Sequence, residues 1–136
     1  MSKVSITFFS STGNTEEIAN IIRDNINDDL YFSDIENIDT DIFFESDKYI
    51  LGSHADGEEE IDTLYMEPFI NENSRKFYGK EIFLFGSYGW GDGLFMDKWK
   101  ENMESLGANV IDTFAVEETP DSEQIDILIK KINDFL

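Results

Sequence analysis

The sequence contains no cysteine, and only 2 of its 136 residues are proline. Without a thiol the chain cannot form a disulfide, a thiolate metal site or a cysteine nucleophile. No apolar run approaches the roughly 20 residues of a membrane-spanning helix. The amino-terminal residues carry one lysine and no long apolar core, so a secretory leader is not expected. We therefore expect a cytoplasmic protein without a metal site.

Basic residues are also scarce. The chain has 10 Lys and Arg against 30 Asp and Glu, which gives a formal net charge of −20 at pH 7. Nucleic acids and anionic membranes would be repelled, so neither is expected as a partner. A strongly acidic surface favours basic partners that bind quickly and dissociate again. Plain solubility, or a saline habitat, is the alternative explanation.

The apolar residues predict a single domain over residues 1–136, and 40% of the chain is hydrophobic. Apolar runs typical of buried strands occur at 4–9, 30–32, 49–52, 82–86 and 110–116. The segments between most of them have apolar residues at helical spacing, including a face shared by Met66, Phe69, Ile70 and Phe77. One or two helical turns are expected at 41–44, capped by Asp39 or Asp41. This alternation predicts an α/β fold, a doubly wound five-stranded parallel sheet of order 2-1-3-4-5 with helices on both faces.

Such a sheet binds ligands at the carboxyl ends of the strands beside the point where the strand order reverses. Loops 10–15, 53–60 and 86–94 follow strands one, three and four. They are also the most unusual stretches of the sequence. We therefore expect these loops to form the functional site.

The first loop predicts a phosphate site. It lies between a strand and a helix and reads Ser10-Ser11-Thr12-Gly13-Asn14-Thr15. A helix N-terminus carries a partial positive charge and free N–H groups, so it can hold a phosphate without Lys or Arg. The alternative is that Thr12 or Asn14 only caps the helix.

The other two loops suit a flat redox ligand. In loop 86–94, four glycines surround Tyr88 and Trp90, so the backbone can approach a ring system while the aromatic faces contact it. Alternatively, these aromatic side chains fold back onto the core. In loop 53–60, the glycine at position 57 would let a peptide unit turn over. The acidic residues around it either form a solvated face or shift the potential of a bound redox ring.

Together the loops resemble those of the flavodoxins, in particular the short-chain, clostridial type that binds flavin mononucleotide (FMN). The likeness covers nearly the whole chain, and no long insertion interrupts the fifth strand. By this resemblance the FMN-binding residues are Ser10, Ser11, Thr12, Gly13, Asn14, Thr15, Ser53, His54, Ala55, Asp56, Gly57, Glu58, Glu59, Ser87, Tyr88, Gly89, Trp90, Gly91 and Asp92.

The resemblance also implies individual roles. Trp90 would stack on one face of the flavin, and Glu59 would bind its pyrimidine edge. Gly57 would turn its carbonyl toward the ring after the first electron and so favour the neutral semiquinone. Asp56 departs from the family, which usually has a methionine there over the inner flavin face. His54, the one histidine, is either structural or a contact to the phosphate.

The function implied is that of a soluble, low-potential one-electron carrier that cycles between the semiquinone and the hydroquinone of FMN. We expect a monomer without a substrate of its own, whose partners are a flavodoxin reductase and low-potential oxidoreductases with basic patches. The alternative is a flavoprotein dedicated to one enzyme, such as an activator of a ribonucleotide reductase. A phosphoacceptor receiver domain is excluded, because it needs acidic residues at Ser10-Ser11 and a lysine where Glu117-Glu118 stand.

Overall fold

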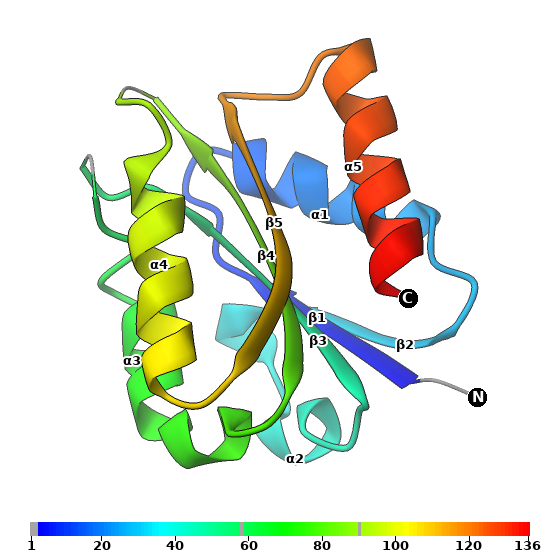
Figure 1. The fold of residues 1–136 in the computed structure, drawn as a ribbon, viewed down its shortest axis with the longest axis vertical. Coiled ribbons are helices and arrows are strands. Elements are labelled where there is room, and N and C mark those ends of the chain that lie inside the picture. Colours follow the sequence, from blue (N-terminus) through cyan, green and yellow to red (C-terminus); the bar gives the residue numbers. More distant parts are fainter. Residues whose placement is uncertain (1–2, 58, 90) are drawn as a thin grey trace.

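The computed structural model describes residues 3–57, 59–89 and 91–136 (Figure 1). Its strands form one parallel sheet with the order β2-β1-β3-β4-β5. They are β1 (Lys3–Phe8), β2 (Asp29–Asp34), β3 (Lys48–His54), β4 (Glu81–Tyr88) and β5 (Asn109–Glu117). The predicted doubly wound sheet is therefore confirmed.

Helices cover both faces of the sheet (Figure 1). Helices α1 (Asn14–Asp24) and α5 (Ser122–Phe135) lie on one face, and α2 (Thr40–Phe43), α3 (Met66–Glu72) and α4 (Leu94–Ser105) lie on the other. Two 3₁₀ turns, η1 (Ile35–Asn37) and η2 (Ser74–Phe77), complete the described elements. None of the helices in the described ranges is long and apolar enough to cross a membrane.

The core consists of two layers because successive strand residues point to opposite faces. On β3, Tyr49 and Leu51 pack with the α2, α3 and α4 side, whereas Ile50 packs with the α1 and α5 side. Trp99 of α4 and Phe43 of α2 are among the large side chains buried in the first layer. This two-sided burial explains the nearly continuous apolar runs of the strands.

Two local predictions had different outcomes. Asp39 caps α2 as expected, since its carboxylate accepts hydrogen bonds from the amides of Asp41 and Ile42. The single helical face through Phe77 is wrong, because α3 ends at Glu72 and Phe77 belongs to the separate turn η2. Phe77 is still fully buried, so the pattern identified a core residue but not its helix.

The parallel register brings three strand ends to one edge of the sheet. Phe8 of β1 lies beside Gly52 of β3, and His54 of β3 lies beside Ser87 of β4. The pairing continues past β1 and β3, since Phe9 N donates to Gly52 O at 3.0 Å and the next amide after His54 donates to Ser87 O at 2.8 Å. Loops 10–15, 53–60 and 86–94 all begin at this edge.

Candidate functional site

The loop after β1 wraps around a serine hydroxyl. Ser10 Oγ accepts hydrogen bonds from Gly13 N at 3.1 Å and from Glu16 N at 3.2 Å. Gly13 is the N-cap of α1, with a φ of 98°, and as a glycine it has no side chain with which to cap the helix. Glycine adopts this left-handed backbone conformation more easily than any other residue. The interpretation that Thr12 or Asn14 caps the helix is therefore wrong.

Thr15 gives this loop an unused buried donor. The residue is 1% exposed, and its Oγ1 has no hydrogen-bond partner among the described residues. A buried hydroxyl without a partner costs about 1–3 kcal/mol, and a ligand that supplies the missing partner would remove this cost. Ser11 and Thr12 are exposed beside it. A hydroxyl in the first turn of a helix is a suitable donor for a phosphate group, as the sequence predicts for this loop.

Loop 53–60 is folded as a narrow hairpin. Ala55 and Ile61 form an antiparallel bridge, and Asp56 N donates to Glu60 O at 2.7 Å. At its tip Gly57 has a φ of 88°, and a Cβ there would meet no atom within 4 Å. Glu58 lies outside the described residues. The hairpin is therefore held at its base, and the change of conformation expected at Gly57 stays a prediction.

Two buried side chains hold the base of this hairpin, and the sequence predicted a role for one of them. Ser53, an expected cofactor contact, is fully buried, accepts from Asp62 N at 3.0 Å and donates to His54 O at 2.9 Å. Asp62 was not predicted to have a role. It is 2% exposed, and its carboxylate accepts hydrogen bonds from Tyr65 N and Met66 N at 2.6 and 2.8 Å. The available signal was an acidic residue four positions before the predicted helical face.

Loop 86–94 is anchored by β4 and by the start of α4. Ser87 is buried, and its hydroxyl donates to Glu118 O at 2.7 Å. Tyr88 is half-buried and packs edge-on against Phe95 of α4, with 6.3 Å between the ring centroids. For Tyr88, the alternative of folding back toward the core therefore describes the structure in part.

The tip of the same loop carries the remaining predicted contacts. Gly89 and Asp92 are exposed, and Gly91 has a positive φ of 83°. A Cβ on Gly89 would meet no atom within 4 Å, so the backbone there is open to a flat ligand. The predicted stacking residue Trp90 lies outside the described residues, and its role stays a prediction.

His54 ends β3 within an aromatic cluster. Its ring lies 5.4 Å from that of Phe9, which stacks on Tyr65 at 4.7 Å. Nδ1 of His54 is buried and has no partner among the described residues. Phe9 directly precedes Ser10, so this cluster borders the expected phosphate loop. A contact between His54 and the phosphate remains a prediction.

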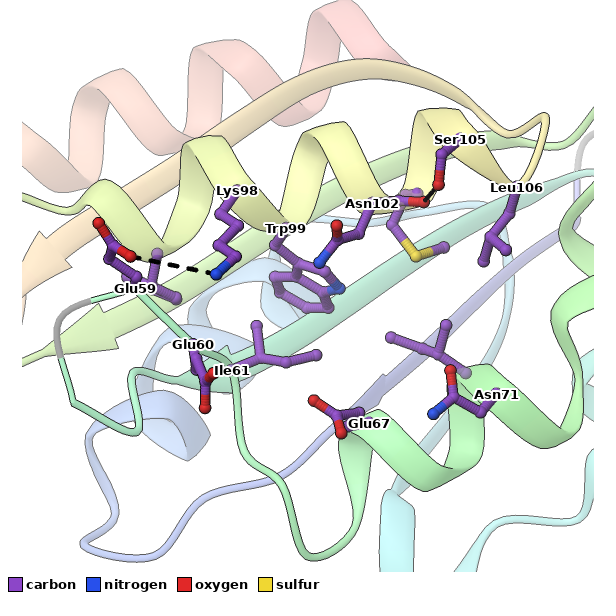
Figure 2. A pocket seen from close by; sticks show the side chains of 13 residues that line it. Glu59, Glu60, Ile61, Glu67, Asn71, Lys98, Trp99, Asn102, Ser105 and Leu106 are labelled. Carbon is purple, nitrogen blue, oxygen red and sulfur yellow. Dashed lines mark hydrogen bonds and ion pairs between the residues drawn. The ribbon is translucent and has the colours of Figure 1, made fainter.

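A groove of about 370 Å³ lies between α3 and α4, over one face of the sheet, and adjoins loop 53–60 (Figure 2). Lys98 of α4 reaches across to Glu59, with 4.0 Å between Nζ and Oε2. Trp99 lines the groove, and its buried Nε1 has no partner among the described residues. Among the described residues, the groove meets the predicted cofactor loops at Glu59 and Glu60 of loop 53–60, and the rest of its lining comes from Ile61, α3, α4 and Leu106.

The arrangement of these loops agrees with the comparison to known proteins. A family model described as Flavodoxin matches residues 6–130. The chain belongs to the flavodoxin family. The match includes the end of β1, strands β2 to β5 and all three loops.

Individual flavodoxins are similar over most of their length. The chain is 41% identical to the flavodoxin of Megasphaera elsdenii over 122 residues, which cover 88% of this chain and 89% of that protein. It is 38% identical to the flavodoxin of Clostridium beijerinckii over 127 residues, with 90% and 92% covered. The solution structure of two-electron reduced Megasphaera elsdenii flavodoxin has a TM-score of 0.85, with 96% and 98% of the two chains covered.

These findings give the chain its cofactor and its general role. Flavodoxins carry electrons on bound FMN, and this chain is an FMN-bound electron carrier. The likeness to the Megasphaera and Clostridium flavodoxins confirms the short-chain, clostridial type. The three loops at the carboxyl edge of the flavodoxin sheet then raise the question of which residues hold FMN.

Proposed function

We propose that the first turn of α1 holds the FMN phosphate, that loops 53–60 and 86–94 hold the flavin ring, and that the protein passes single electrons to partners with basic surfaces. FMN supplies the one-electron chemistry, and the chain supplies its binding and its surroundings. The observation that carries the proposal is the buried, unpartnered hydroxyl of Thr15 at the N-terminus of α1.

The phosphate position follows from the donors in loop 10–15. The loop contains no Lys or Arg, so a dianion must be held by N–H and O–H groups and by the helix N-terminus. Ser10 Oγ accepts hydrogen bonds from the amides of Gly13 and Glu16 and so holds the loop in place at the start of α1. Thr15 adds a hydroxyl that would gain its missing partner from a phosphate oxygen. This unused donor supports an anion site at the first turn of the helix.

The ring position follows from the two loops that are open where a side chain would stand. A Cβ on Gly57 or on Gly89 would have no atom within 4 Å, so a flat ring can approach the backbone at both places. Glu59 is exposed in the first of these loops, and Lys98 is its described charge partner. The role of Glu59 as acceptor for the pyrimidine N–H therefore rests on the resemblance to the family, because its carboxylate lies toward Lys98 in this structure. Trp90, in the second loop, remains the proposed stacking partner.

The acidic charge supports transient partners. The loops at 53–60, 86–94 and 117–121 contain carboxylates and no Lys or Arg. A basic redox protein would be guided toward this edge and released again, because complementary charge raises association rates more than affinity. We propose that the protein acts as a cytoplasmic monomer and has no substrate of its own.

FMN binding by Thr15→Val tests the proposal. Valine has the shape of threonine without the hydroxyl, so a lost hydrogen bond to a charged phosphate should raise the FMN dissociation constant about 10- to 100-fold. The FMN-free protein should unfold at the same temperature or a higher one, because a buried unpartnered hydroxyl is removed. Quenching of FMN fluorescence and thermal melts measure the two effects.

Thr7→Val is the matched control. Thr7 is fully buried in β1, and its Oγ1 also lacks a described partner, but it lies outside the proposed site. This variant should keep the wild-type affinity for FMN. If Thr15→Val binds FMN as tightly as Thr7→Val does, the phosphate is not held at the first turn of α1.

Reductive titration of the FMN-loaded protein separates the electron carrier from a dedicated activator. A general carrier should show two well-separated one-electron steps in visible absorption. Steps that overlap, together with tight FMN binding, would favour a protein dedicated to one enzyme. Failure of the wild type to bind FMN would refute both.

A further inference from the structure

The carboxylate of Asp56 is tied to a neighbouring hydroxyl. Thr63 Oγ1 donates a hydrogen bond to Asp56 Oδ2 at 3.0 Å, and both residues are exposed. Asp56 stands where the resemblance to clostridial-type flavodoxins predicts a methionine over the flavin, so the place of its charge matters for the cofactor. In the structure this charge is turned toward residue 63, beyond the bridge that closes the hairpin.

Thr63 is a fixed donor because the residue before it is firmly anchored. The buried carboxylate of Asp62 accepts hydrogen bonds from Tyr65 N and Met66 N, at the start of α3. The amide of Asp62 donates to Ser53 Oγ, at the end of β3. The short segment that carries Thr63 is therefore fastened to the strand on one side and to the helix on the other.

The backbone of Asp56 is fixed as well, whereas its side chain has one described restraint. Asp56 N donates to Glu60 O, and the bridge between Ala55 and Ile61 lies next to it. Among the described residues, Thr63 is the one hydrogen-bond partner of the Asp56 carboxylate. Without that bond an exposed aspartate rotates about its side-chain torsions between staggered positions.

We propose that Thr63 is a positioning residue of the flavin site, an inference that rests on the proposed function. It holds the Asp56 carboxylate at the base of the hairpin, so that this charge does not move toward the ring bound beside Gly57. Reduction adds negative charge to a flavin, and a carboxylate opposes this more strongly the closer it comes. Thr63 thereby keeps FMN binding tighter, and the second reduction potential higher, than a free Asp56 would allow.

Thr63→Val tests the role of the hydroxyl at nearly constant shape. The FMN dissociation constant should rise about two- to fivefold, the size expected for one exposed hydrogen bond. The midpoint potential of the second electron should fall. Thr63→Ser keeps the donor and should restore both values. Thr119→Val, at another exposed threonine, should match the wild type.

Asp56→Asn separates positioning of a charge from a general effect on the loop. Asparagine keeps the shape but removes the charge, so Thr63→Val should no longer lower the second potential in this background. An equal fall in both backgrounds would overturn the proposal, as would a Thr63→Val protein with wild-type affinity and potential. Thr63→Ala serves if the valine variant does not fold. These outcomes presuppose that the wild type binds FMN; its failure to do so would refute the proposed function instead.

Discussion

Single residues at the site divide into those that face the expected cofactor and those that hold the loops. The hydroxyls of Ser53 and Ser87 are both buried and donate to backbone carbonyls. Sequence resemblance places them among the FMN contacts, and the structure shows what they do within the chain itself. Ser53 fastens the base of the 53–60 hairpin, and Ser87 fastens the β5–α5 loop to β4.

Gly57 is the residue on which the redox behaviour should depend most. Its φ of 88° is strained for any residue with a Cβ, although there is space for one. Valine at 57 would resist the change of conformation that the resemblance assigns to this peptide. We expect Gly57→Val to narrow the gap between the two reduction potentials, measured by spectroelectrochemical titration.

Gly79→Val is a suitable control for that experiment. Gly79 has a φ of 75° and equally open surroundings, but it precedes β4 at the opposite edge of the sheet. The Gly79→Val variant should lose as much stability as Gly57→Val does, but the gap between its two reduction potentials should stay that of the wild type. An unchanged gap in Gly57→Val would show that the peptide at 57 does not respond to the redox state.

Tyr49 predicts a pH dependence of stability. Burial raises the pKa of the Tyr49 hydroxyl above its ordinary value of 10.0, and the negative charge of Asp47 acts in the same direction. Above pH 10 the unfolded chain loses this proton first, so the unfolding free energy falls as pH rises, by at most about 1.4 kcal/mol per pH unit. Below pH 10 the contribution is fully present.

Tyr49→Phe isolates this effect in chemical denaturation between pH 7 and 11.5. At pH 7 the variant should be about 1 kcal/mol less stable, because the carbonyl of Ser46 loses its buried donor. That difference should shrink above pH 10, where the wild type alone must keep a buried phenol protonated. Stability curves that run parallel from pH 9 to pH 11.5 would contradict the assignment.

At the scale of elements, β4 has no room for a side chain at Gly86, where the strand passes the proposed site. A Cβ on Gly86 would lie 2.3 Å from Ser53 O of the adjacent strand and 2.8 Å from Cζ of Phe95. The backbone atom cannot move without breaking the pairing of β3 and β4. We expect Gly86→Ala to lower the unfolding free energy by about 1–3 kcal/mol or more, the cost of overpacking a core.

Gly89→Ala provides the comparison in the same loop. A Cβ there meets nothing within 4 Å, and Gly89 is not among the glycines with a positive φ. Its unfolding free energy in urea should stay near that of the wild type. If both variants were equally stable, β4 would have room that the structure does not show.

The elements show what could be predicted from the sequence and what could not. The strand predicted at 49–52 extends in the structure to His54, because Ser53 and His54 pair with β4 although they are polar. A pattern of apolar residues indicates burial. It therefore identifies the middle of a strand and misses polar residues that pair at its ends. The three loops could be predicted because strand order alone brings the ends of β1, β3 and β4 together.

The partners of individual side chains could not be predicted in this way. The cap of α1 is an example, since the polar residues near it suggested Thr12 or Asn14, whereas Gly13 occupies the position. The hydrogen bond from Thr63 to Asp56 also depends on how the hairpin folds back, which no periodicity encodes. Such contacts depend on tertiary geometry.

For the whole molecule, charge is distributed unevenly along the strand direction. Lys3 and Lys48 lie at the amino ends of β1 and β3, and Lys80 directly precedes β4. The loops at the carboxyl edge, at 53–60, 86–94 and 117–121, carry acidic residues without Lys or Arg. This distribution predicts that a basic partner is attracted to the edge where FMN is proposed to bind.

This asymmetry predicts a strong effect of salt on electron transfer. With a net charge of −20, the reduced protein should react with a basic cytochrome c at a rate that falls steeply between about 0.01 and 0.15 M salt, as the Debye length shortens from about 30 to 8 Å. Reaction with a small neutral oxidant should depend little on salt, and stopped-flow absorption measures both. Glu118→Lys, at the carboxyl edge, should slow the cytochrome reaction more than Glu81→Lys, at the amino end of β4. Equal effects of the two substitutions would mean that net charge alone, and not its concentration at one edge, governs the encounter.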